Sequence, residues 1–247
     1  MSAWLFDLGN TRLKCAPLGT DGSVGASLAL PHRQEDVAAA MAQQLPARID
    51  VAYVASVARP ELRVAVLDAL AARCGRIAIA RTQPRFGEVR IAYADPRKLG
   101  VDRFLAIIAA HARAQGHPAL VCGVGTALTV DLVDGAGHHL GGRIAPSPTL
   151  MREALHARAP QLPEQGGTYA DFASDTEDAL ASGCDGAGVA LIAHSLDAAR
   201  QRLGTAPRLF LHGGGSEALA PHLPSATEVA TLVLEGLARW ARVETAA

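Results

Sequence analysis

The sequence predicts an α/β protein with two like domains, because the same order of elements occurs twice along the chain. In each half, an apolar run ends in a glycine turn, at Gly9 and at Gly125, and further strand-like segments follow. Alternating helical and apolar segments then complete each half. The 247 residues suffice for two modest domains, which we place at 1–113 and 114–247. Two unrelated hairpins within one α/β fold are the alternative interpretation.

The first half is expected to begin with three antiparallel strands. The turn at Gly9-Asn10 and the hairpin signal Asp21-Gly22 separate these strands, and Pro60 marks the start of a helix. The expected elements are strands at 3–7, 12–18 and 24–30, a helix at 35–44, a strand at 51–56, a helix from 60, a strand at 76–80 and a helix from 101.

The second half repeats this order. Gly125 forms the turn, and Asp134-Gly135 is the next hairpin signal. The expected elements are strands at 120–124, 129–133 and 139–144, helices at 150–157 and 176–201, a strand at 208–212 and a helix at 230–243.

Composition argues against several classes of partner. The net charge of -1 provides no basic field for nucleic acid. No apolar run reaches the roughly 18 residues that span a bilayer, and the N-terminus lacks the basic lead and cleavage site of a signal peptide. We therefore expect a cytoplasmic protein. Its four cysteines lie far apart, which favours free thiols in a reducing compartment over a metal site: Cys15, Cys74, Cys122 and Cys184.

The segment 7–14 has the composition of a phosphate-binding turn: Asp7-Leu8-Gly9-Asn10-Thr11-Arg12-Leu13-Lys14. Glycine lets backbone N–H groups approach phosphate oxygens closely, and hydroxyl and basic side chains follow. A carboxylate at the end of a buried strand can organise a magnesium ion through its water shell. An ordinary tight turn with a local Asp–Asn network is the alternative.

A second turn, Gly123-Val124-Gly125-Thr126, has a similar glycine pattern without the early acid. The Thr126 hydroxyl would reach phosphate oxygens. Asp131 follows on the next strand, where pairing within the sheet is the alternative role. Two such turns that face one another would hold a nucleoside triphosphate, so the pair predicts a phosphoryl-transfer enzyme.

Asp102 and Arg103 are expected in the first turn of a helix, because Val101, Leu105 and Ile108 fall on one apolar face. In the simpler interpretation, the helix dipole stabilises the acid by about 0.3–1 kcal/mol. Arginine is poorly placed for the dipole there, so we expect it to have another partner. The functional interpretation makes Asp102 a base that orients an alcohol, and Arg103 a bidentate anchor for an anionic group.

Three further segments have both a structural and a functional interpretation. The glycine-rich segment at 141–146 ends a strand and turns into a helix, and its glycines would either let a substrate lie against the backbone or form a wide turn. The segment at 212–216 follows an apolar strand and opens a helix. The second segment begins with His212 and suits a nucleotide's sugar, base edge or phosphate. This second segment does not fit the GxGxxG pattern in a βαβ unit, which disfavours a dinucleotide fold. Thr176 is the expected N-cap of the long helix, which is its default role.

Together these motifs resemble the type III pantothenate kinases, whose superfamily also contains acetate and sugar kinases, Hsp70 and actin. The resemblance spans nearly the whole chain, and its specific part is a GxDR box followed by GTAxTxD. It implies duplicated ribonuclease H-like (actin-like ATPase) domains with a central cleft. The matching segments are Asp7 to Thr11, Tyr93 to Pro96, Gly100 to Arg103, Gly125 to Asp131, Gly141 to Pro146, Thr176 to Gly183 and Gly213-Gly214.

The resemblance implies ATP-dependent phosphorylation of pantothenate to 4'-phosphopantothenate, the first step of coenzyme A biosynthesis. It implies that Asp7 to Lys14 and Thr126 bind ATP, and that Asp102 is the general base on the primary hydroxyl. The usual ions of the family are Mg²⁺ and a monovalent cation, K⁺ or NH₄⁺, and its members are typically homodimers. Pantothenate would be held by Tyr93, Gly100, Val101, Asp102, Arg103 and Thr176.

Two positions depart from the family pattern. Gly123 stands where the family usually has an aspartate associated with the monovalent cation, and Ser147 stands where glycine is usual. Gly123 offers only a carbonyl, which leaves three outcomes: the cation binds more weakly, Asp131 substitutes for the missing acid, or activity is lost. The alternative function is therefore a catalytically silent relative that acts as a regulatory or transcriptional accessory protein. A kinase for a different small acid or sugar is a third hypothesis.

Overall fold

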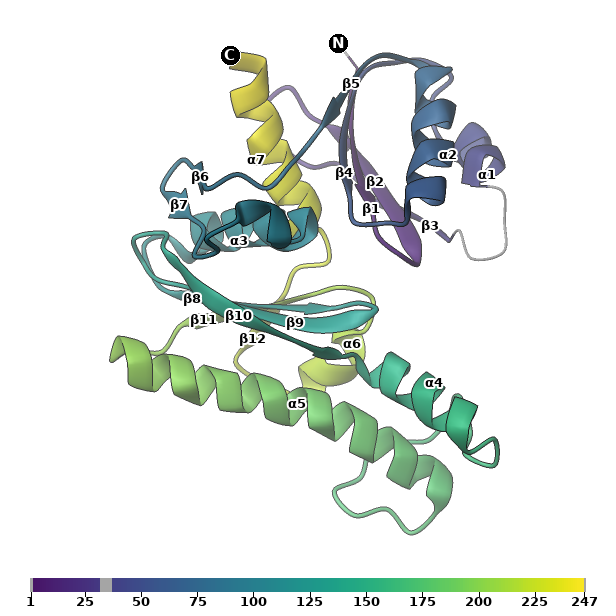
Figure 1. Cartoon of the computed structure of the whole chain (residues 1–247), viewed down its shortest axis with the longest axis vertical. Helices are drawn as coiled ribbons and strands as arrows, with labels where there is room; N and C mark the ends of the chain where they lie inside the picture. The colour runs from purple at the N-terminus through teal and green to yellow at the C-terminus, as the bar shows by residue number, and fades with distance from the viewer. Residues whose placement is uncertain (1, 32–36, 247) are drawn as a thin grey trace. The chain divides into compact units, whose positions relative to one another are not determined.

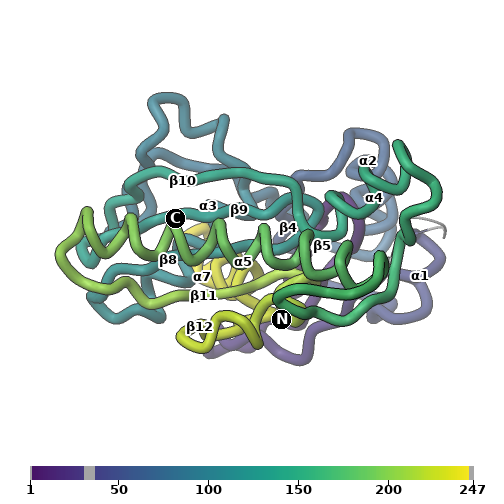
Figure 2. Tube along the Cα trace, turned by 90° about the horizontal axis from the view of Figure 1, so that it is seen from below, coloured from purple at the N-terminus to yellow at the C-terminus, as the bar shows by residue number. Residues whose placement is uncertain are grey.

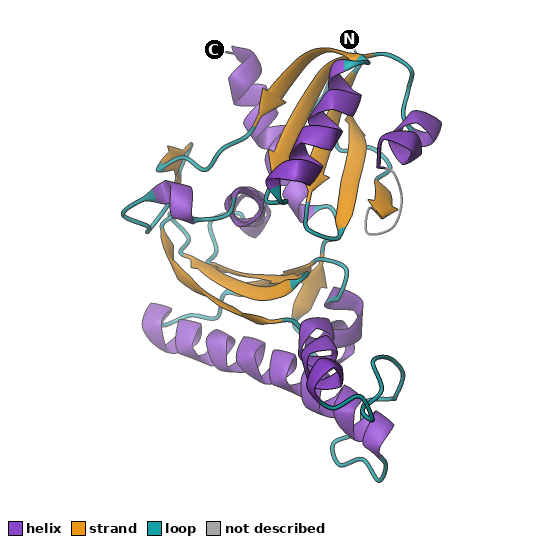
Figure 3. Ribbon diagram, turned by 45° about the vertical axis from the view of Figure 1, so that its right-hand side comes forward, coloured by secondary structure: helices purple, strands orange, loops and turns teal. Residues whose placement is uncertain are grey.

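The computed structural model describes residues 2–31 and 37–246, and the chain divides into two compact units. The first unit comprises Met1–Arg113 and Thr231–Ala247, and the second comprises Ala114–Ala230. Each unit contains one main sheet with helices packed beside it (Figures 1 and 3). Both sheets are mixed and five-stranded, and the strand orders match: β3-β2-β1-β4-β5 in the first and β10-β9-β8-β11-β12 in the second. The predicted duplication is thereby confirmed. The cleft that the resemblance implies concerns the relative placement of the two units and stays a prediction.

The central strand of the first sheet is β1 (Ala3–Leu8). It pairs antiparallel with β2 (Arg12–Leu18) and parallel with β4 (Ile49–Ser56). The edge strands are β3 (Leu28–Pro31) and β5 (Cys74–Ile79). Most of β1 and β4 is apolar, as expected for strands that are covered on both faces.

Two helices, α1 (Val37–Gln44) and α2 (Pro60–Ala71), cover one face of the first sheet (Figure 1). Their buried side chains share a core with the sheet, in which Phe6, Met41 and Leu70 are fully enclosed. Pro60 begins α2 as predicted, since the first turn of a helix does not need its N–H. Residues 35 and 36 of the helix predicted at 35–44 lie outside the described residues.

The last helix, α7 (Leu232–Ala246), belongs to the first unit. From its sequence we expected this helix in the second domain, at 114–247, and its contacts with the first sheet correct that assignment. The helix contacts β1, β2 and β4, and the ring of Trp240 packs edge-on against Tyr53 with 6.4 Å between centroids. An apolar helix face fits either domain as a pattern, so only these long-range contacts decide which core it completes.

Two helices of the first unit cross closely. A Cβ on Gly236 of α7 would overlap the backbone carbonyl of Leu105, which lies on α3 (Val101–Ala114). Arg113 and Glu235 join the same two helices by a bidentate ion pair, with N···O distances of 2.6 and 2.8 Å. Glycine at the crossing therefore allows α7 to approach α3 more closely than any other residue would.

The second sheet repeats the first strand by strand. Its central strand β8 (Ala119–Val124) pairs antiparallel with β9 (Ala127–Val133) and parallel with β11 (Arg208–His212). The edge strands are β10 (His139–Pro146) and β12 (Ala226–Glu228). The first and second turns therefore occupy equivalent places, after β1 and after β8.

Helix α5 (Thr176–Leu203) runs along the second sheet and contacts β8 and β9 (Figure 2). Its Ile192 and the strand residue Leu211 are fully buried in one core. Gly204 ends the helix in a left-handed conformation with φ of 69°, the usual conformation after a helix C-terminus. The remaining helices of this unit are α4 (Pro148–Arg158), α6 (Ser216–Leu219) and the 3-10 turn η2 (Ala220–His222).

One helix in the described part of the chain, α5, is long and apolar enough to cross a bilayer by length and composition alone. Its most apolar window has a mean hydropathy of 1.2, and 33% of that window is buried. Small and polar residues interrupt the window, so the sequence shows no continuous apolar run there. Because α5 packs along a sheet as core helices do, this finding is a weak indicator of a membrane.

Two details differ from the sequence prediction. The third strand begins at Leu28, because Val24 forms only an isolated bridge with Leu18. A short ladder of β6 (Arg85–Phe86) and β7 (Val89–Arg90) is not predicted, since two residues are too few to show an alternating pattern.

Candidate active site

The Asp7 carboxylate lies beside the first turn, near the end of β1. Asp7 is in register with Lys14 on β2 and with Ala55 on β4, so the acidic and basic side chains emerge on the same face of the sheet. The Gly9 N–H donates a hydrogen bond to the Arg12 carbonyl at 3.1 Å and closes the hairpin. The hairpin thus places one carboxylate and one ammonium group next to a backbone turn.

A second carboxylate acts on Asp7. The pKa of Asp7 is raised to about 7, chiefly by burial and further by the negative charge of Asp102, whereas Lys14 lowers it. The structure therefore brings the predicted phosphate turn and the predicted base into one electrostatic environment within the first unit.

Asp102 lies in the first turn of α3, as predicted. The Phe104 N–H donates a hydrogen bond to the Gly100 carbonyl at 3.0 Å, so the helix starts from Gly100. A Cβ on Gly100 would lie 2.5 Å from Asp102 Oδ1. The carboxylate therefore occupies the space that any larger residue at position 100 would need.

Arg103 is almost buried, with 7% of its surface exposed. Its Nη1 donates a hydrogen bond to the Tyr93 hydroxyl at 3.3 Å, and its guanidinium carbon lies 6.0 Å from the centre of the Tyr93 ring. This contact supplies the partner that the sequence led us to expect. A guanidinium held in this way is suited to a planar anionic group, because its N–H donors form a fixed fork.

Thr126 lies at the exposed tip of the β8–β9 hairpin, where its hydroxyl is accessible. The Gly125 N–H donates a hydrogen bond to the Ala127 carbonyl at 3.0 Å. Beside this turn the chain leaves β11 through Gly213, whose φ of 100° and close approach to the Val124 backbone exclude a side chain. The end of β11 therefore packs directly against the strand that carries the second turn.

Asp175, and not Thr176, caps α5. The Asp175 carboxylate accepts a hydrogen bond from the Asp178 N–H at 3.0 Å, and its extended backbone is typical of an N-cap. Thr176 is the first helical residue, so the capping role assigned to it from sequence is wrong by one position. Adjacent hydroxyl and carboxylate residues both suit this role, and only the backbone conformation distinguishes them.

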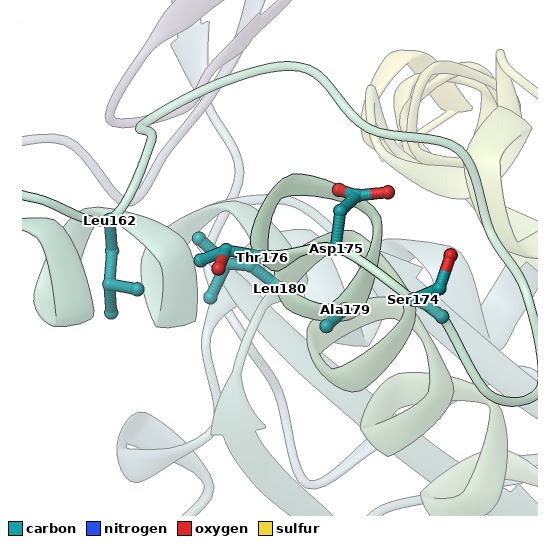
Figure 4. A pocket seen from close by; sticks show the side chains of 7 residues that line it. Leu162, Ser174, Asp175, Thr176, Ala179 and Leu180 are labelled. Carbon is teal, nitrogen blue, oxygen red and sulfur yellow. The ribbon is translucent and has the colours of Figure 1, made fainter.

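A pocket of about 520 Å³ lies at the start of α5 in the second unit (Figure 4). Its lining combines apolar and polar side chains: Leu162, Ala173, Ser174, Asp175, Thr176, Ala179 and Leu180. Tyr93, Gly100 and Arg103 belong to the first unit. A joint role of Thr176 with these residues therefore stays a prediction.

Comparison with known proteins identifies the family. A family model described as type III pantothenate kinase matches residues 4–198. A Stenotrophomonas maltophilia protein named type III pantothenate kinase is 57% identical over 241 residues, which is 98% of each chain. This chain belongs to the type III pantothenate kinase family. The resemblance seen in the sequence motifs is confirmed.

Solved structures with low sequence identity to this chain have the same fold. A Campylobacter jejuni protein assigned to the Baf family of transcriptional activators has a TM-score of 0.65 at 20% identity, over 99% of this chain and 100% of its own. An archaeal actin homolog has a TM-score of 0.52 at 11% identity, over 98% of this chain and 100% of its own. At such identities the likeness shows the fold alone, and it confirms the predicted actin-like class.

At position 123 of this type III pantothenate kinase family member, two neighbouring side chains fill the space that the aspartate usual in the family would need. A Cβ on Gly123 would lie 2.8 Å from Thr129 Oγ1, 2.9 Å from His212 Nε2 and 3.0 Å from His212 Cε1. An imidazole and a hydroxyl thus occupy the space of the missing side chain. Within residues 2–31 and 37–246, no three acidic, histidine or cysteine side chains form a metal-binding group. Gly123 therefore lacks the carboxylate that the resemblance associates with the monovalent cation, and the side-chain donors nearest to this position are the Thr129 hydroxyl and the His212 imidazole.

Asp131 does not replace the missing acid by moving toward the turn. Its side chain is buried in the sheet, and its Oδ1 lies 3.0 Å from Nε2 of His139, which is also buried. Of the two roles considered from sequence, pairing within the sheet is the one observed. The sequence contains no local signal for this pair, because the two residues meet only when β9 and β10 form a ladder.

His212 is a functional candidate whose neighbours could not be predicted from the sequence. Its signal was the histidine that opens the glycine-rich segment after β11, which indicated a ligand but no contact with Gly123. The register supplies that contact, since His212 on β11 is paired with Gly123 on β8.

Proposed function

We propose that this chain transfers the γ-phosphoryl group of ATP to pantothenate and forms 4'-phosphopantothenate for coenzyme A biosynthesis. Membership of the type III pantothenate kinase family supports this function. The observation that carries the proposal is the position of Asp102, which is fixed against Gly100 and close enough to Asp7 to raise its pKa. A base and a phosphate turn in one environment are what transfer to an alcohol requires.

ATP binding is assigned to both turns. In the first turn, backbone N–H groups and the side chains near Lys14 would contact phosphate oxygens. In the second, the exposed Thr126 hydroxyl would donate to the phosphates. The full set of proposed ATP-binding residues is Asp7, Leu8, Gly9, Asn10, Thr11, Arg12, Leu13, Lys14 and Thr126.

Asp102 would accept the proton of the primary hydroxyl of pantothenate. The hydroxyl oxygen forms a bond to the γ-phosphorus while the bond from that phosphorus to the bridging oxygen breaks and ADP leaves. The Arg103 guanidinium would hold the pantothenate carboxylate in a bidentate contact. Tyr93, Gly100, Val101 and Thr176 complete the proposed substrate site.

A magnesium ion fits the donor chemistry around Asp7. The carboxylate oxygens of Asp7 are the hard ligands that Mg²⁺ prefers, directly or through water. Burial and Asp102 both disfavour the negative charge of Asp7, and a nearby cation would offset that cost. When bound with ATP, Mg²⁺ would neutralise charge on the phosphates. Asp7 would then hold the ion through its water shell.

A homodimer is also proposed, on the basis of the family resemblance. Exposed large apolar side chains of the second unit would be covered in such an assembly, among them Ile144 at 66% and Phe172 at 98% exposure. We further propose a cytoplasmic location and no nucleic-acid partner, in keeping with the net charge of -1. Light scattering coupled to size-exclusion chromatography measures the oligomeric state directly.

The decisive experiment is a coupled assay of ADP release with purified protein, ATP, Mg²⁺ and pantothenate. Turnover that depends on pantothenate supports the proposed function. Folded protein without turnover would favour a silent regulatory relative, which the retained Asp7, Asp102, Arg103 and Thr126 argue against. A panel of other small acids and sugars as acceptors tests the third hypothesis.

Replacing the base tests the mechanism. We expect Asp102→Asn to lower kcat by at least roughly 100-fold, the usual effect of losing a positioned base. The substitution is nearly isosteric, so the thermal melting curve should keep its cooperative shape. Near-normal turnover of a folded Asp102→Asn protein would remove Asp102 from the mechanism.

A further inference from the structure

The matched strand orders allow one place in the two sheets to be compared directly. Asp7 on β1 and Gly123 on β8 each lie one residue pair before the end of the antiparallel ladder, opposite Lys14 and Thr129 respectively. On the parallel neighbour, Asp7 pairs with Ala55 of β4 and Gly123 pairs with His212 of β11. The first unit therefore has its functional side chain on the central strand, and the second unit has it on the neighbouring strand.

The two arrangements compete for the same space within the second sheet. The His212 ring atom Nε2 lies 2.9 Å from the point where a Cβ on Gly123 would stand, and Thr129 Oγ1 lies 2.8 Å from the same point. Real Cβ atoms do not have neighbours this close, so an aspartate at position 123 would displace the ring. Glycine at 123 and histidine at 212 thus form a matched pair.

The imidazole belongs to the residue at the C-terminal end of β11, next to the strand that leads into the second turn. His212 is the last residue of β11, and the following Gly213 packs on the backbone of Val124, which immediately precedes the turn. An imidazole presents N–H donors and, when protonated, a positive charge, and both suit phosphate oxygens. An aspartate with a bound monovalent cation would supply positive charge in the same place.

We propose that His212 binds the ATP phosphates in place of an aspartate-bound monovalent cation, so that this kinase works without K⁺ or NH₄⁺. This inference rests on the proposed kinase function. His212 would then be an additional ATP-binding residue. The aspartate that would hold a cation is absent at position 123, and the His212 imidazole would supply the hydrogen-bond donor for the phosphates.

The test compares nucleotide binding and turnover in KCl and in choline chloride at equal ionic strength. Calorimetry with the non-hydrolysable analogue AMPPNP and Mg²⁺ gives Kd, and the coupled assay gives kcat. For the unmodified protein we expect both quantities to change by less than about twofold between the salts. A tenfold or larger activation by K⁺ would overturn the proposal.

Substitution at position 212 tests the donor role. We expect His212→Ala to raise the Kd for AMPPNP by roughly tenfold in either salt, the effect of losing a charge-assisted hydrogen bond. His194→Ala is the matched control, because His194 is exposed on α5, and it should leave Kd unchanged. An unchanged Kd for folded His212→Ala would also overturn the proposal.

Restoring the aspartate provides the converse test. In the double variant Gly123→Asp with His212→Ala, removal of the ring leaves only Thr129 Oγ1 close to the new Cβ, and this hydroxyl can turn away by rotation about χ1. We expect this variant to bind AMPPNP at least roughly tenfold tighter in KCl than in choline chloride. If the folded double variant bound AMPPNP equally well in the two salts, the proposal that His212 takes the place of an aspartate-bound cation would be contradicted. Absence of turnover in every salt would instead count against the kinase function, while the binding measurements still decide the role of His212.

Discussion

The Asp7 carboxyl lies where burial and a second carboxylate both oppose its negative charge. Its pKa of about 7 in the folded protein compares with 3.8 for an unperturbed aspartate. The folded state therefore retains a proton that the unfolded chain releases between pH 4 and pH 7. The free energy of unfolding should fall as pH rises through that window and level off above it.

Because the pKa of Asp7 is raised, we expect Asp7→Asn to stabilise the protein while it abolishes activity. The gain over the unmodified protein should be close to zero near pH 4 and about 2 kcal/mol at pH 8, after allowance for solvent screening of a partly exposed group. Urea denaturation in EDTA at several pH values measures this difference without bound metal. If the difference in the free energy of unfolding between the two proteins did not change with pH, the negative charge of Asp7 would not destabilise the folded state.

Gly100 is predicted to matter through the position of the Asp102 carboxylate. In Gly100→Ala, the added Cβ would lie 2.5 Å from Asp102 Oδ1, so the carboxylate must turn away. We expect kcat to fall by roughly tenfold or more, because a base displaced by about 1 Å loses much of its effect. The unfolding midpoint should change little.

Gly186→Ala is the matched control for this substitution. A Cβ on Gly186 meets the Tyr169 hydroxyl at 3.7 Å, which is an ordinary contact, and the residue lies inside α5. This variant should keep its kcat and gain about 0.5–1 kcal/mol of stability from helix propensity. Equal kcat values for the two variants would show that the glycine of the GxDR box does not position the base.

At the scale of elements, the matched strand pairing gives the two sheets the same local arrangement. In each, the turn after the central strand lies beside the C-terminal end of the neighbouring parallel strand. The register places Lys14 beside Asp7 in the first sheet and His212 beside Gly123 in the second. The two hairpins are therefore alike in backbone and different in chemistry. Duplication of the fold did not preserve the charge at the equivalent position.

The crossing of α3 and α7 gives a prediction about packing. Gly236→Ala would drive a methyl group into the backbone of Leu105, which cannot rotate away as a side chain can. We expect a loss of about 3 kcal/mol in the free energy of unfolding, despite the better helix propensity of alanine. Chemical denaturation measures this loss. Stability equal to that of the unmodified protein would show that the two helices separate at little cost.

At the scale of the whole molecule, the chain returns to its first unit at the end. The second unit is continuous from Ala114 to Ala230, whereas the first consists of two segments distant in sequence. Trp240 and the rest of α7 pack on β1 and β4. The first unit therefore depends on residues that follow the second unit in the sequence.

Truncation after residue 230 is predicted to affect the two units differently. Loss of α7 exposes apolar surface on the first sheet, so amide protection against hydrogen exchange should be lost in β1 and β4. Protection in β8 and β9 should remain, since every strand of their sheet is still present. Uniform loss of protection in both sheets would show that the units fold only together.

The turns and the box to which we assign the chemistry could be proposed from the sequence, because each is a local pattern. Asp7 to Lys14, the GxDR box and Thr126 were identified from residue type and spacing, and the GxDR arrangement in the first turn of α3 is observed. The N-cap at Asp175 and the unit to which α7 belongs were not predictable. Both depend on backbone conformation or on contacts between distant residues.

The sequence by itself determined the repeated strand–turn–strand pattern, the family and the identity of the candidate base, because periodicity and motif spacing act over a few residues. Tertiary structure alone decided the charge environment of Asp7, the pairing of Asp131 with His139 and the filling of the Gly123 position by His212. Each of these depends on which side chains meet across strands or from distant elements. Register and burial, which govern desolvation and close contact, exist only in the folded chain.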